Sequence, residues 1–368
     1  MIEVVPVTDK RTFNEFLQLP FKLYSKDSLW VPPLLKDIKD QFAPENPFFK
    51  HAQIASFIAK SGGKTVGRIT AIHNEAHIDF SREKAGFFGF FDCVDEISAA
   101  LPLIEKARQW LKQKGMVVLR GPMNFSSNEE WGSLIEGFDE SPMIMMPYNF
   151  PYYKDLFENC GLTKAKDLFA YIIDIPDKLP EKTYRVASIA EKHGVKVRPL
   201  NIKAFDEEMA TFKSIYNSAW GKNWGFIPMT DEEIDHMAEK LKPIIIPDLT
   251  LIAECDGEAA GFMMLLPDFN FALKKLNGRL FPFGIFKALW YSRRIKDLRI
   301  LLLGVKEKYR RRGVDAFMFI EGLKTIKKLG YKRAEFSWIL EDNYPVQKII
   351  GMAGGRLYKK YRIYEIEI

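Results

Sequence analysis

The sequence predicts an α/β protein in which one structural unit occurs twice. Apolar runs of strand length alternate along the chain with longer stretches whose apolar residues recur at helical spacing. Glycines also recur in register: Gly67 is matched by Gly261, 194 positions later, and Gly115 by Gly330, 215 positions later. We therefore expect two units with the same order of strands and helices, each long enough to bury its own core.

The first half is expected to contain five strands and two main helices. Asp9 is placed to cap a helix that carries Phe13 and Phe16 on one face. The second helix is expected at 97–113, where apolar residues recur every three or four positions until Gly115. Around these helices we expect strands at 1–6, 55–59, 67–72, 86–91 and 116–119.

The second half repeats this order after a linker. The stretch IPDKLPEK interrupts the strand pattern, and a short helix is expected before a strand that begins at residue 195. The periodicity then predicts a hairpin at 249–255 and 259–266, a central strand at 298–305, a helix at 317–329, a strand at 333–340, a helix at 343–352 and closing strands at 356–368. We therefore divide the chain into a domain of residues 1–175, a linker of residues 176–194 and a domain of residues 195–368.

Composition excludes several classes of protein. Of the 368 residues, 47% are hydrophobic and 28% are charged, which is typical of a globular protein. The net charge of +6 is too small for so long a chain to indicate nucleic-acid binding. Three cysteines far apart indicate neither a disulfide framework nor a zinc site, and we expect no bound metal. Without a signal peptide or an apolar run of membrane-spanning length, we expect a cytoplasmic protein with no integral membrane segment.

One stretch of the second half has the composition of an anion-binding turn. The apolar run 301–303 is followed by three consecutive arginines, Arg310–Arg312, and by Gly313. A helical pattern begins at Ala316. At the start of a helix, free backbone N–H groups and the positive end of the helix dipole attract phosphate, and glycine lets the backbone approach closely. The alternative is a solvated arginine turn, which is the commoner outcome for three adjacent arginines.

This turn resembles the pyrophosphate-binding motif of the GCN5-related N-acyltransferase (GNAT) family. That motif is arginine or glutamine, two residues, glycine, one residue, and then glycine or alanine. Arg310 and Gly313 fit it, whereas Asp315 departs from it at the last position. The resemblance implies two tandem GNAT-like domains, each a mixed, mostly antiparallel sheet flanked by helices. It also implies acyl-CoA as a co-substrate and no tightly bound cofactor.

The resemblance assigns the donor site to the second domain only. The site would comprise Leu303, Val305, Arg310, Arg311, Arg312, Gly313, Val314, Asp315, Ala316 and Asn343. The corresponding turn of the first half, residues 90–95, has two acids and no arginine. We therefore expect the first domain to have lost donor binding.

Acyl transfer from a thioester to an amine needs a polarised carbonyl, a neutral amine and a proton for the departing thiolate. In GNAT proteins a backbone N–H of the splayed central strand polarises the carbonyl, and the resemblance places that strand segment at 301–305. The tyrosine that many relatives carry inside the last helix is absent, and Tyr344 is the candidate to replace it. Glu341 and Glu335 are the candidate bases, unless both lie on a solvated strand face. Asn343 either contacts the pantetheine arm or only caps the helix.

Two further segments are unusual in composition. Residues 121–153 mix amides, hydroxyls and aromatic rings with glycine and proline, which suits either a pocket for a small polar or amphipathic ligand or an ordered loop between domains. Residues 281–294 are aromatic with a basic end, and we expect a buried helix or else a cover for an acyl chain or a contact with a membrane surface. The candidate acceptor-binding residues are Asn124, Asn128, Tyr148, Tyr152 and Trp338.

These features predict an acyltransferase that moves an acyl group from acyl-CoA, or from acyl carrier protein, to an amine of a small acceptor. Two alternatives remain open. One is a non-catalytic ligand-binding or scaffolding protein that retains the fold, which the missing tyrosine and Asp315 favour. The other is a transferase that takes aminoacyl groups from tRNA, although no long basic stripe supports it and we expect no nucleic-acid partner.

Overall fold

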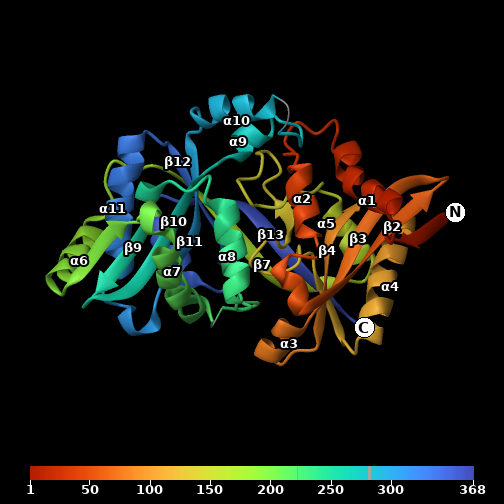
Figure 1. Ribbon diagram of the computed structural model, residues 1–368, viewed down its shortest axis with the longest axis horizontal. Coiled ribbons are helices and arrows are strands. Elements are labelled where there is room, and N and C mark those ends of the chain that lie inside the picture. The colour runs from red at the N-terminus through yellow and green to blue at the C-terminus, as the bar shows by residue number, and fades with distance from the viewer. Residues whose placement is uncertain (222, 281–282) are drawn as a thin grey trace. The chain divides into compact units, whose positions relative to one another are not determined.

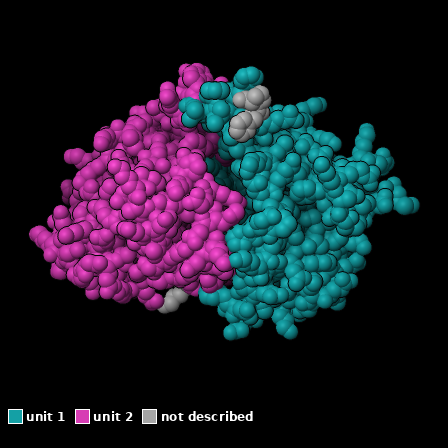
Figure 2. Space-filling model, in the orientation of Figure 1, with its two compact units in different colours: residues 1–168, 272–289, 359–368 teal, residues 169–271, 290–358 magenta. Residues whose placement is uncertain are grey.

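The computed structural model describes residues 1–221, 223–280 and 283–368 (Figure 1). It divides into two compact units, shown in Figure 2: unit 1 comprises residues 1–168, 272–289 and 359–368, and unit 2 comprises residues 169–271 and 290–358. Both units draw on separate parts of the chain, and the division into a domain of residues 1–175, a linker of residues 176–194 and a domain of residues 195–368 stays a prediction. No helix in the described part of the chain is both long and apolar enough to traverse a bilayer.

Unit 1 is built on a mixed sheet. Its strands, in spatial order, are β1 (Ile2–Pro6), β2 (Ala52–Ser61), β3 (Lys64–Asn74), β4 (Ala85–Cys93), β5 (Val118–Gly121) and β13 (Arg356–Glu367). Strands β4 and β5 are parallel, whereas the other neighbours from β1 to β13 are antiparallel. A short strand, β6 (Ser133–Glu136), also pairs with β13.

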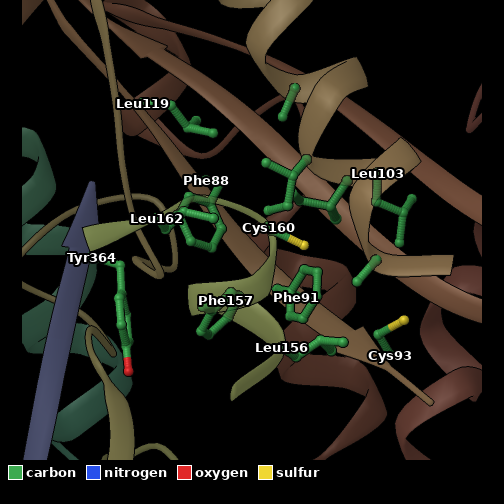
Figure 3. Packing of buried hydrophobic residues seen from close by; sticks show 14 of the residues in the cluster. Phe88, Phe91, Cys93, Leu103, Leu119, Leu156, Phe157, Cys160, Leu162 and Tyr364 are labelled. Atoms are coloured by element: carbon green, nitrogen blue, oxygen red, sulfur yellow. The ribbon is translucent and has the colours of Figure 1, made fainter. Parts of the chain in front are cut away.

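The core of unit 1 lies between this sheet and helix α4. The α4 side chains Leu103, Ala107 and Leu111 are fully buried with Phe88 of β4 and Phe157 of α5, as Figure 3 shows for most of this cluster. Asp9 caps the first helix through a reciprocal capping box with Thr12, as the sequence predicted. The helices of unit 1 are α1 (Lys10–Leu23), α2 (Leu35–Gln41), η1 (Pro47–Lys50), α3 (Glu75–Ser81), α4 (Ile97–Gln113) and α5 (Tyr153–Asn159).

Unit 2 has the same kind of sheet. Its strands, in spatial order, are the second part of β7 (Thr163–Asp174), then β12 (Arg333–Leu340), β11 (Asp297–Val305), β10 (Glu258–Pro267), β9 (Thr250–Cys255) and β8 (Val195–Pro199). Strands β11 and β12 are parallel, and the pairs from β8 to β11 are antiparallel. The fold class that the sequence predicted, mixed and mostly antiparallel sheets flanked by helices, is therefore confirmed.

Helices cover both faces of the second sheet. Met318 of α11 packs with Leu298, Ile300 and Met263 on one face. On the other face the ring of Phe212 in α7 lies 4.7 Å from that of Phe262 in β10. The helices are α6 (Glu181–Lys192), η2 (Ile202–Ala204), α7 (Phe205–Trp220), α8 (Asp231–Leu241), η3 (Pro247–Leu249), α9 (Asn270–Leu273), α10 (Gly284–Ser292), η4 (Glu307–Tyr309), α11 (Val314–Leu329) and α12 (Tyr344–Met352).

Two expectations were wrong. Residues 356–368 were expected to follow the strand at 333–340 in the second sheet, but β13 lies between β5 and β7 in the strand order and pairs with β5 and β6 of the first half of the chain. The segment 281–294 was expected to form a buried helix, but none of the residues of α10 is buried. The first two residues of the segment, Phe281 and Pro282, lie outside the described residues. Both errors concern the surface against which an element packs. The periodicity within an element predicts whether it is a helix or a strand, but not its packing partner.

Candidate functional site

The central strands of unit 2 separate halfway along their length. β11 and β12 are paired only from Asp297 with Arg333 to Ile300 with Phe336. Beyond that point residues 301–303 and 337–340 are partly exposed, whereas residues 298–300 are buried. The register between β10 and β11 also skips Leu301, which forms a bulge there. The strand segment predicted to polarise a carbonyl, residues 301–305, thus lies where β11 has lost its parallel neighbour.

The turn after β11 presents backbone N–H groups at the start of α11. Gly313 is the N-cap residue with a φ of 77°, and no side chain caps the helix. The first intrahelical bond runs from the Phe317 N–H to the Gly313 carbonyl. Within the described chain the N–H groups of residues 313–316 have no acceptor, and Asp315 accepts none of them. Gly313 and Val314 are buried, whereas Asp315 and Ala316 are partly exposed. Unbonded N–H groups at the positive end of a helix dipole form the arrangement that binds an anion.

The three arginines of this turn have different surroundings. Arg310 donates to two backbone carbonyls, at 2.7 Å to Ala219 and at 3.3 Å to Val305. Arg312 lies 3.8 Å from the Asp256 carboxylate. Arg311 is exposed and has neither a hydrogen bond nor an ion pair among the described residues. Arg310 therefore holds the turn in place, and Arg311 is the guanidinium that has no partner within the protein.

Gly313 also fixes how the turn packs. A Cβ at this position would lie 2.8 Å from the Val186 side chain and 2.9 Å from the Val186 carbonyl oxygen of α6. Its positive φ is strained for any other L-residue. The glycine that the sequence analysis singled out is thus required both by the backbone conformation and by the contact with α6.

A buried polar cluster lies on the α7 face of β11 and β12. Arg299, 1% exposed, donates to the Ser337 hydroxyl at 2.8 Å and lies 3.5 Å from the Glu335 carboxylate. Glu335 is fully buried and also accepts a hydrogen bond from the Tyr358 hydroxyl. The sequence analysis found Glu335 but missed Arg299 and Tyr358. The signal available was an arginine at an inward position of an otherwise apolar strand.

Trp338 departs from the alternation of β12. Its φ is 55°, which places it in the left-handed region. Its ring lies 4.6 Å from the Arg299 guanidinium, although the preceding Ser337 bonds the same arginine. Strict alternation would have sent these two neighbours to opposite faces of the strand, so β12 is irregular at Trp338.

The start of α12 leaves the Asn343 side chain without a role in the helix. Asn343 is the N-cap residue, but its carboxamide caps no N–H and has no hydrogen bond among the described residues. Tyr344, at the first position of α12, is 71% exposed and does not pack at the helix start. Glu341 is partly exposed, and its carbonyl accepts a hydrogen bond from the Gln347 side chain. Asn343, Tyr344 and Glu341 therefore lie at least partly in solvent at the end of β12.

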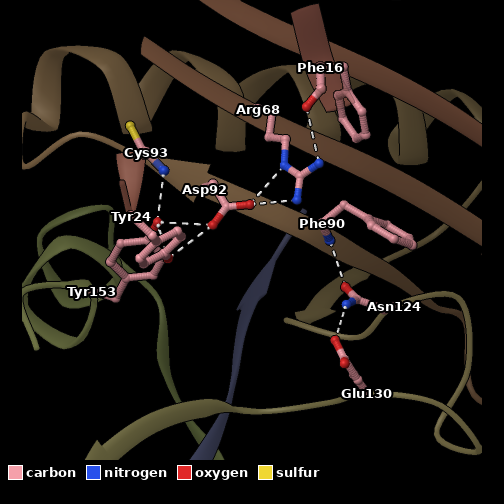
Figure 4. A network of polar contacts seen from close by, with 9 residues as sticks. All are labelled: Phe16, Tyr24, Arg68, Phe90, Asp92, Cys93, Asn124, Glu130 and Tyr153. Atoms are coloured by element: carbon pink, nitrogen blue, oxygen red, sulfur yellow. Dashed lines mark hydrogen bonds and ion pairs between the residues drawn. The ribbon is translucent and has the colours of Figure 1, made fainter. Parts of the chain in front are cut away.

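In unit 1 the parallel strands β4 and β5 also separate partway along their length, but side chains of unit 1 fill the space between them. Strands β4 and β5 are paired only from Ala85 to Phe87. Beyond that point the Asn124 carboxamide accepts a hydrogen bond of 2.7 Å from the Phe90 N–H, and donates one of 3.0 Å to Glu130 (Figure 4). A Cβ on Gly89 would lie only 1.9 Å from the Met123 carbonyl oxygen. The loop after β5 thus occupies the space where the strands part.

One of the two acids of the first turn, Asp92, is paired within unit 1. The Asp92 carboxylate forms an ion pair of 2.7 Å with Arg68, which also donates to the Phe16 carbonyl. The same carboxylate accepts a hydrogen bond of 3.0 Å from the Tyr24 hydroxyl (Figure 4). Asp92 and Arg68 are 8% and 7% exposed. The protein's own side chains thus occupy this turn, which supports the expectation that unit 1 does not bind the donor.

The loop residues proposed for the acceptor are bonded within unit 1. The Tyr148 hydroxyl donates to Asp27 at 2.7 Å, and the Tyr152 hydroxyl donates to the Cys93 carbonyl at 2.7 Å. Burial raises the pKa of both tyrosines, which keeps them protonated as donors. The Asn128 N–H donates to the Ser126 hydroxyl at 3.2 Å. These contacts, with those of Asn124, fit the alternative of an ordered loop, and acceptor binding by these residues stays a prediction.

Comparison with known proteins defines the class. No family model matches the chain. The structure resembles a tandem GNAT protein from the clavulanic acid biosynthesis pathway, with a TM-score of 0.59 and 12% identity over 100% of this chain and 98% of that chain. It also resembles a GCN5-related N-acetyltransferase from Sphaerobacter thermophilus, with a TM-score of 0.55 and 12% identity over 100% and 95% of the two chains. The protein therefore has the tandem GNAT fold.

Two curated relatives are close enough to define a family. The chain is 38% identical to "Bacterial ceramide synthase" of Caulobacter vibrioides (strain NA1000 / CB15N), over 99% of this chain and 97% of the relative. It is 35% identical to "Protein YghO" of Escherichia coli (strain K12), over 98% of this chain and 94% of that protein. The chain belongs to the family that these two proteins represent.

Proposed function

We propose that this protein is an N-acyltransferase that moves an acyl group from acyl-CoA to the amine of a long-chain amino alcohol, in the second unit. The observation that carries the proposal is the contrast between the two units. In unit 2 the strands part and the helix start keeps four N–H groups free, whereas in unit 1 Asn124 and Asp92 fill the equivalent places. The intact pattern of unit 2 supports a donor site there.

The turn favours a donor that contains a pyrophosphate. Acyl carrier protein and acyl-CoA share the pantetheine arm, but only CoA adds a pyrophosphate to it. Free helix N–H groups together with the unpaired Arg311 suit two adjacent phosphates, because charge-assisted hydrogen bonds to guanidinium are among the stronger polar contacts. Acyl carrier protein remains the alternative donor. Asn343, whose carboxamide has no partner among the described residues, is assigned to the pantetheine arm.

The acceptor class comes from the relative. Ceramide, in the name of the Caulobacter vibrioides protein, is the amide of a fatty acid with a long-chain amino alcohol. Similarity over nearly the full length of both chains supports the same bond chemistry here. The acceptor is accordingly an amphipathic amine rather than a fully polar one.

The reaction assigns roles to three residues. The neutral amine attacks the thioester carbonyl, the new C–N bond forms, the C–S bond breaks, and the thiolate takes up a proton. Glu341 removes the proton from the ammonium group of the acceptor, because its side chain is partly exposed. Glu335 is buried beside Arg299 and accepts a hydrogen bond from Tyr358, so it does not take this role. Tyr344, exposed at the start of α12, supplies the proton for the thiolate.

The test is a transfer assay with purified protein, long-chain acyl-CoA and sphinganine, in which the N-acyl product is detected by mass spectrometry. We expect the amide to form, and Glu341→Gln to lower kcat by about 100-fold, the size of a typical general-base contribution. The matched control is Glu321→Gln, a glutamate on α11 that forms an ion pair with Lys324.

Three outcomes would contradict the proposal in different ways. Product from acyl carrier protein but not from acyl-CoA would move the donor to the carrier protein. Product with a short polar amine but not with sphinganine would show that the acceptor is not a long-chain amino alcohol. No product with either donor, although acyl-CoA binds, would favour the non-catalytic protein.

A further inference from the structure

The segment that precedes β11 concentrates positive charge. From residue 270 to residue 296 the sequence contains seven lysines and arginines and no aspartate or glutamate. This local charge of +7 exceeds the net charge of +6 of the whole chain, so the remainder of the protein is close to neutral. The seven cations are Lys274, Lys275, Arg279, Lys287, Arg293, Arg294 and Lys296.

The same segment exposes large apolar side chains. Phe283 is 72% exposed, Phe286 70%, Leu289 60% and Trp290 50%. Phe283 precedes α10, and the spacing of three and four residues places Phe286, Leu289 and Trp290 on one face of α10 (cyan in Figure 1). Lys287 lies at the margin of that face, and Arg293 and Arg294 follow directly after the last helical residue. None of the residues of α10 is buried.

None of the seven cations of this segment forms an ion pair with a described residue. Lys274 donates to the Ser141 hydroxyl at 2.9 Å, and the Arg294 guanidinium lies 3.5 Å from the centre of the Trp290 ring. Neither contact involves an acid. The other five cations form no ion pair among the described residues, and no acid occurs within the segment to neutralise them. An apolar helix face with unpaired cations around it is therefore open to an anionic partner.

We infer that α10 and its basic flanks, which we call the interfacial segment (residues 270–280 and 283–296), bind the surface of an anionic phospholipid bilayer. A helix that lies in a membrane interface carries Trp, Phe and Leu on one face and Lys and Arg beside them. The aromatic rings then enter the boundary between headgroups and acyl chains, while the cations contact lipid phosphates. A partner protein would need acidic groups that complement seven cations around four protruding apolar side chains, whereas an anionic bilayer supplies both features by itself.

This inference does not rest on the proposed acyl transfer. Binding to a bilayer is measured without substrate, so the inference and the proposed function can fail separately. If both hold, the interfacial segment brings the enzyme to the surface in which an amphipathic amine is dissolved.

The test is flotation with vesicles. Purified full-length protein is mixed with phosphatidylcholine vesicles that contain about one third phosphatidylglycerol, or with phosphatidylcholine vesicles alone, and floated on a density gradient. We expect flotation with the anionic vesicles, much less with the neutral ones, and a bound fraction that falls as salt rises. Phe286→Asp with Leu289→Asp should lower the bound fraction about ten-fold, and Lys287→Glu with Arg293→Glu should do the same.

The controls separate membrane binding from loss of fold. Leu101→Asp, at an apolar side chain on α4 that is 40% exposed, should leave flotation unchanged. Because the substituted side chains of α10 are exposed, all variants should melt within about 2 °C of the parent. Failure of the parent protein to float, or flotation of the α10 variants like the parent, would overturn the inference. A dimer that Phe286→Asp converts to a monomer, without vesicle binding, would assign the face to a second copy of the chain and would overturn it too.

Discussion

The Asn124 carboxamide oxygen lies 2.7 Å from the Phe90 backbone nitrogen, at the point in unit 1 where β4 and β5 part. Phe90 has a φ of 46°, so its N–H is turned out of the regular ladder and needs this partner. We predict that Asn124→Ala lowers the stability of unit 1 by about 1–3 kcal/mol, the cost of an unsatisfied buried N–H. Thermal unfolding is the measurement.

The control for this substitution is Asn14→Ala, at an exposed position of α1. It should leave the melting temperature within about 1 °C of the parent. If Asn124 instead binds the acceptor, its substitution would raise KM for the amine and leave the melting temperature unchanged. That result would contradict the conclusion that the loop after β5 fills the space between β4 and β5.

Gly313→Ala should damage both the turn and donor binding. The new Cβ would meet Val186 at 2.8 Å and adopt a positive φ, so we expect a loss of about 2 kcal/mol in stability and at least ten-fold weaker binding of acyl-CoA. Isothermal titration with acyl-CoA and thermal unfolding are the measurements. Gly330→Ala, at the other end of the same helix, is a close control because its φ is 78° and no atom lies within 4 Å of its Cβ. It should lose about 1 kcal/mol and bind the donor normally. Equal effects of the two variants on donor affinity would place the donor elsewhere.

Arg311→Ala should separate binding from stability. This side chain has no partner among the described residues, so its removal leaves folding unchanged. Loss of a charge-assisted hydrogen bond to phosphate, about 1.5–3 kcal/mol, weakens CoA binding by ten-fold or more. Arg310→Ala should instead lower the melting temperature, because two carbonyls lose their donor. The assignment fails if Arg311→Ala binds CoA as tightly as the parent.

The Arg299–Glu335 pair predicts a large loss of stability from one substitution. Arg299→Met removes the cation beside a carboxylate that is fully buried, and breaking such a pair costs about 3–5 kcal/mol. Lys324→Met removes a cation from an exposed pair with Glu321 and should cost less than about 1 kcal/mol. Chemical denaturation compares the two variants. A loss of similar size in both would show that the Arg299–Glu335 pair contributes no more than a surface pair.

His77 predicts how unit 1 responds to acid. Burial lowers the pKa of His77 to about 4, whereas a histidine in the unfolded chain has a pKa of about 6.5. The unfolded chain therefore binds more protons between these values, and stability falls as the pH is lowered from about 6.5 to 4, by up to about 3 kcal/mol. His77→Gln should flatten that part of a profile of melting temperature against pH, and substitution of the exposed His193 should not. A profile that His77→Gln leaves unchanged would contradict this.

The sequence predicted those parts of the fold that depend on local patterns. Helix α4 occupies the predicted residues 97–113, and Gly313 caps the predicted helix start, because periodicity and glycine chemistry are properties of neighbouring residues. The bond from Phe90 to Asn124 joins residues 34 positions apart, and β13 pairs with β5 more than 200 positions away. Such contacts depend on tertiary packing, which no local pattern specifies. The left-handed Trp338 was missed for the same reason, since alternation assumes a regular strand.

The central claim is that the free N–H groups at the start of α11 bind the acyl donor, and hydrogen–deuterium exchange of these amides tests it most directly. The account predicts that long-chain acyl-CoA slows exchange in a peptide covering residues 310–317 and leaves the equivalent turn of unit 1, residues 90–95, unchanged. Slower exchange at residues 90–95 with none at 310–317, or no change in either at saturating acyl-CoA, would contradict it.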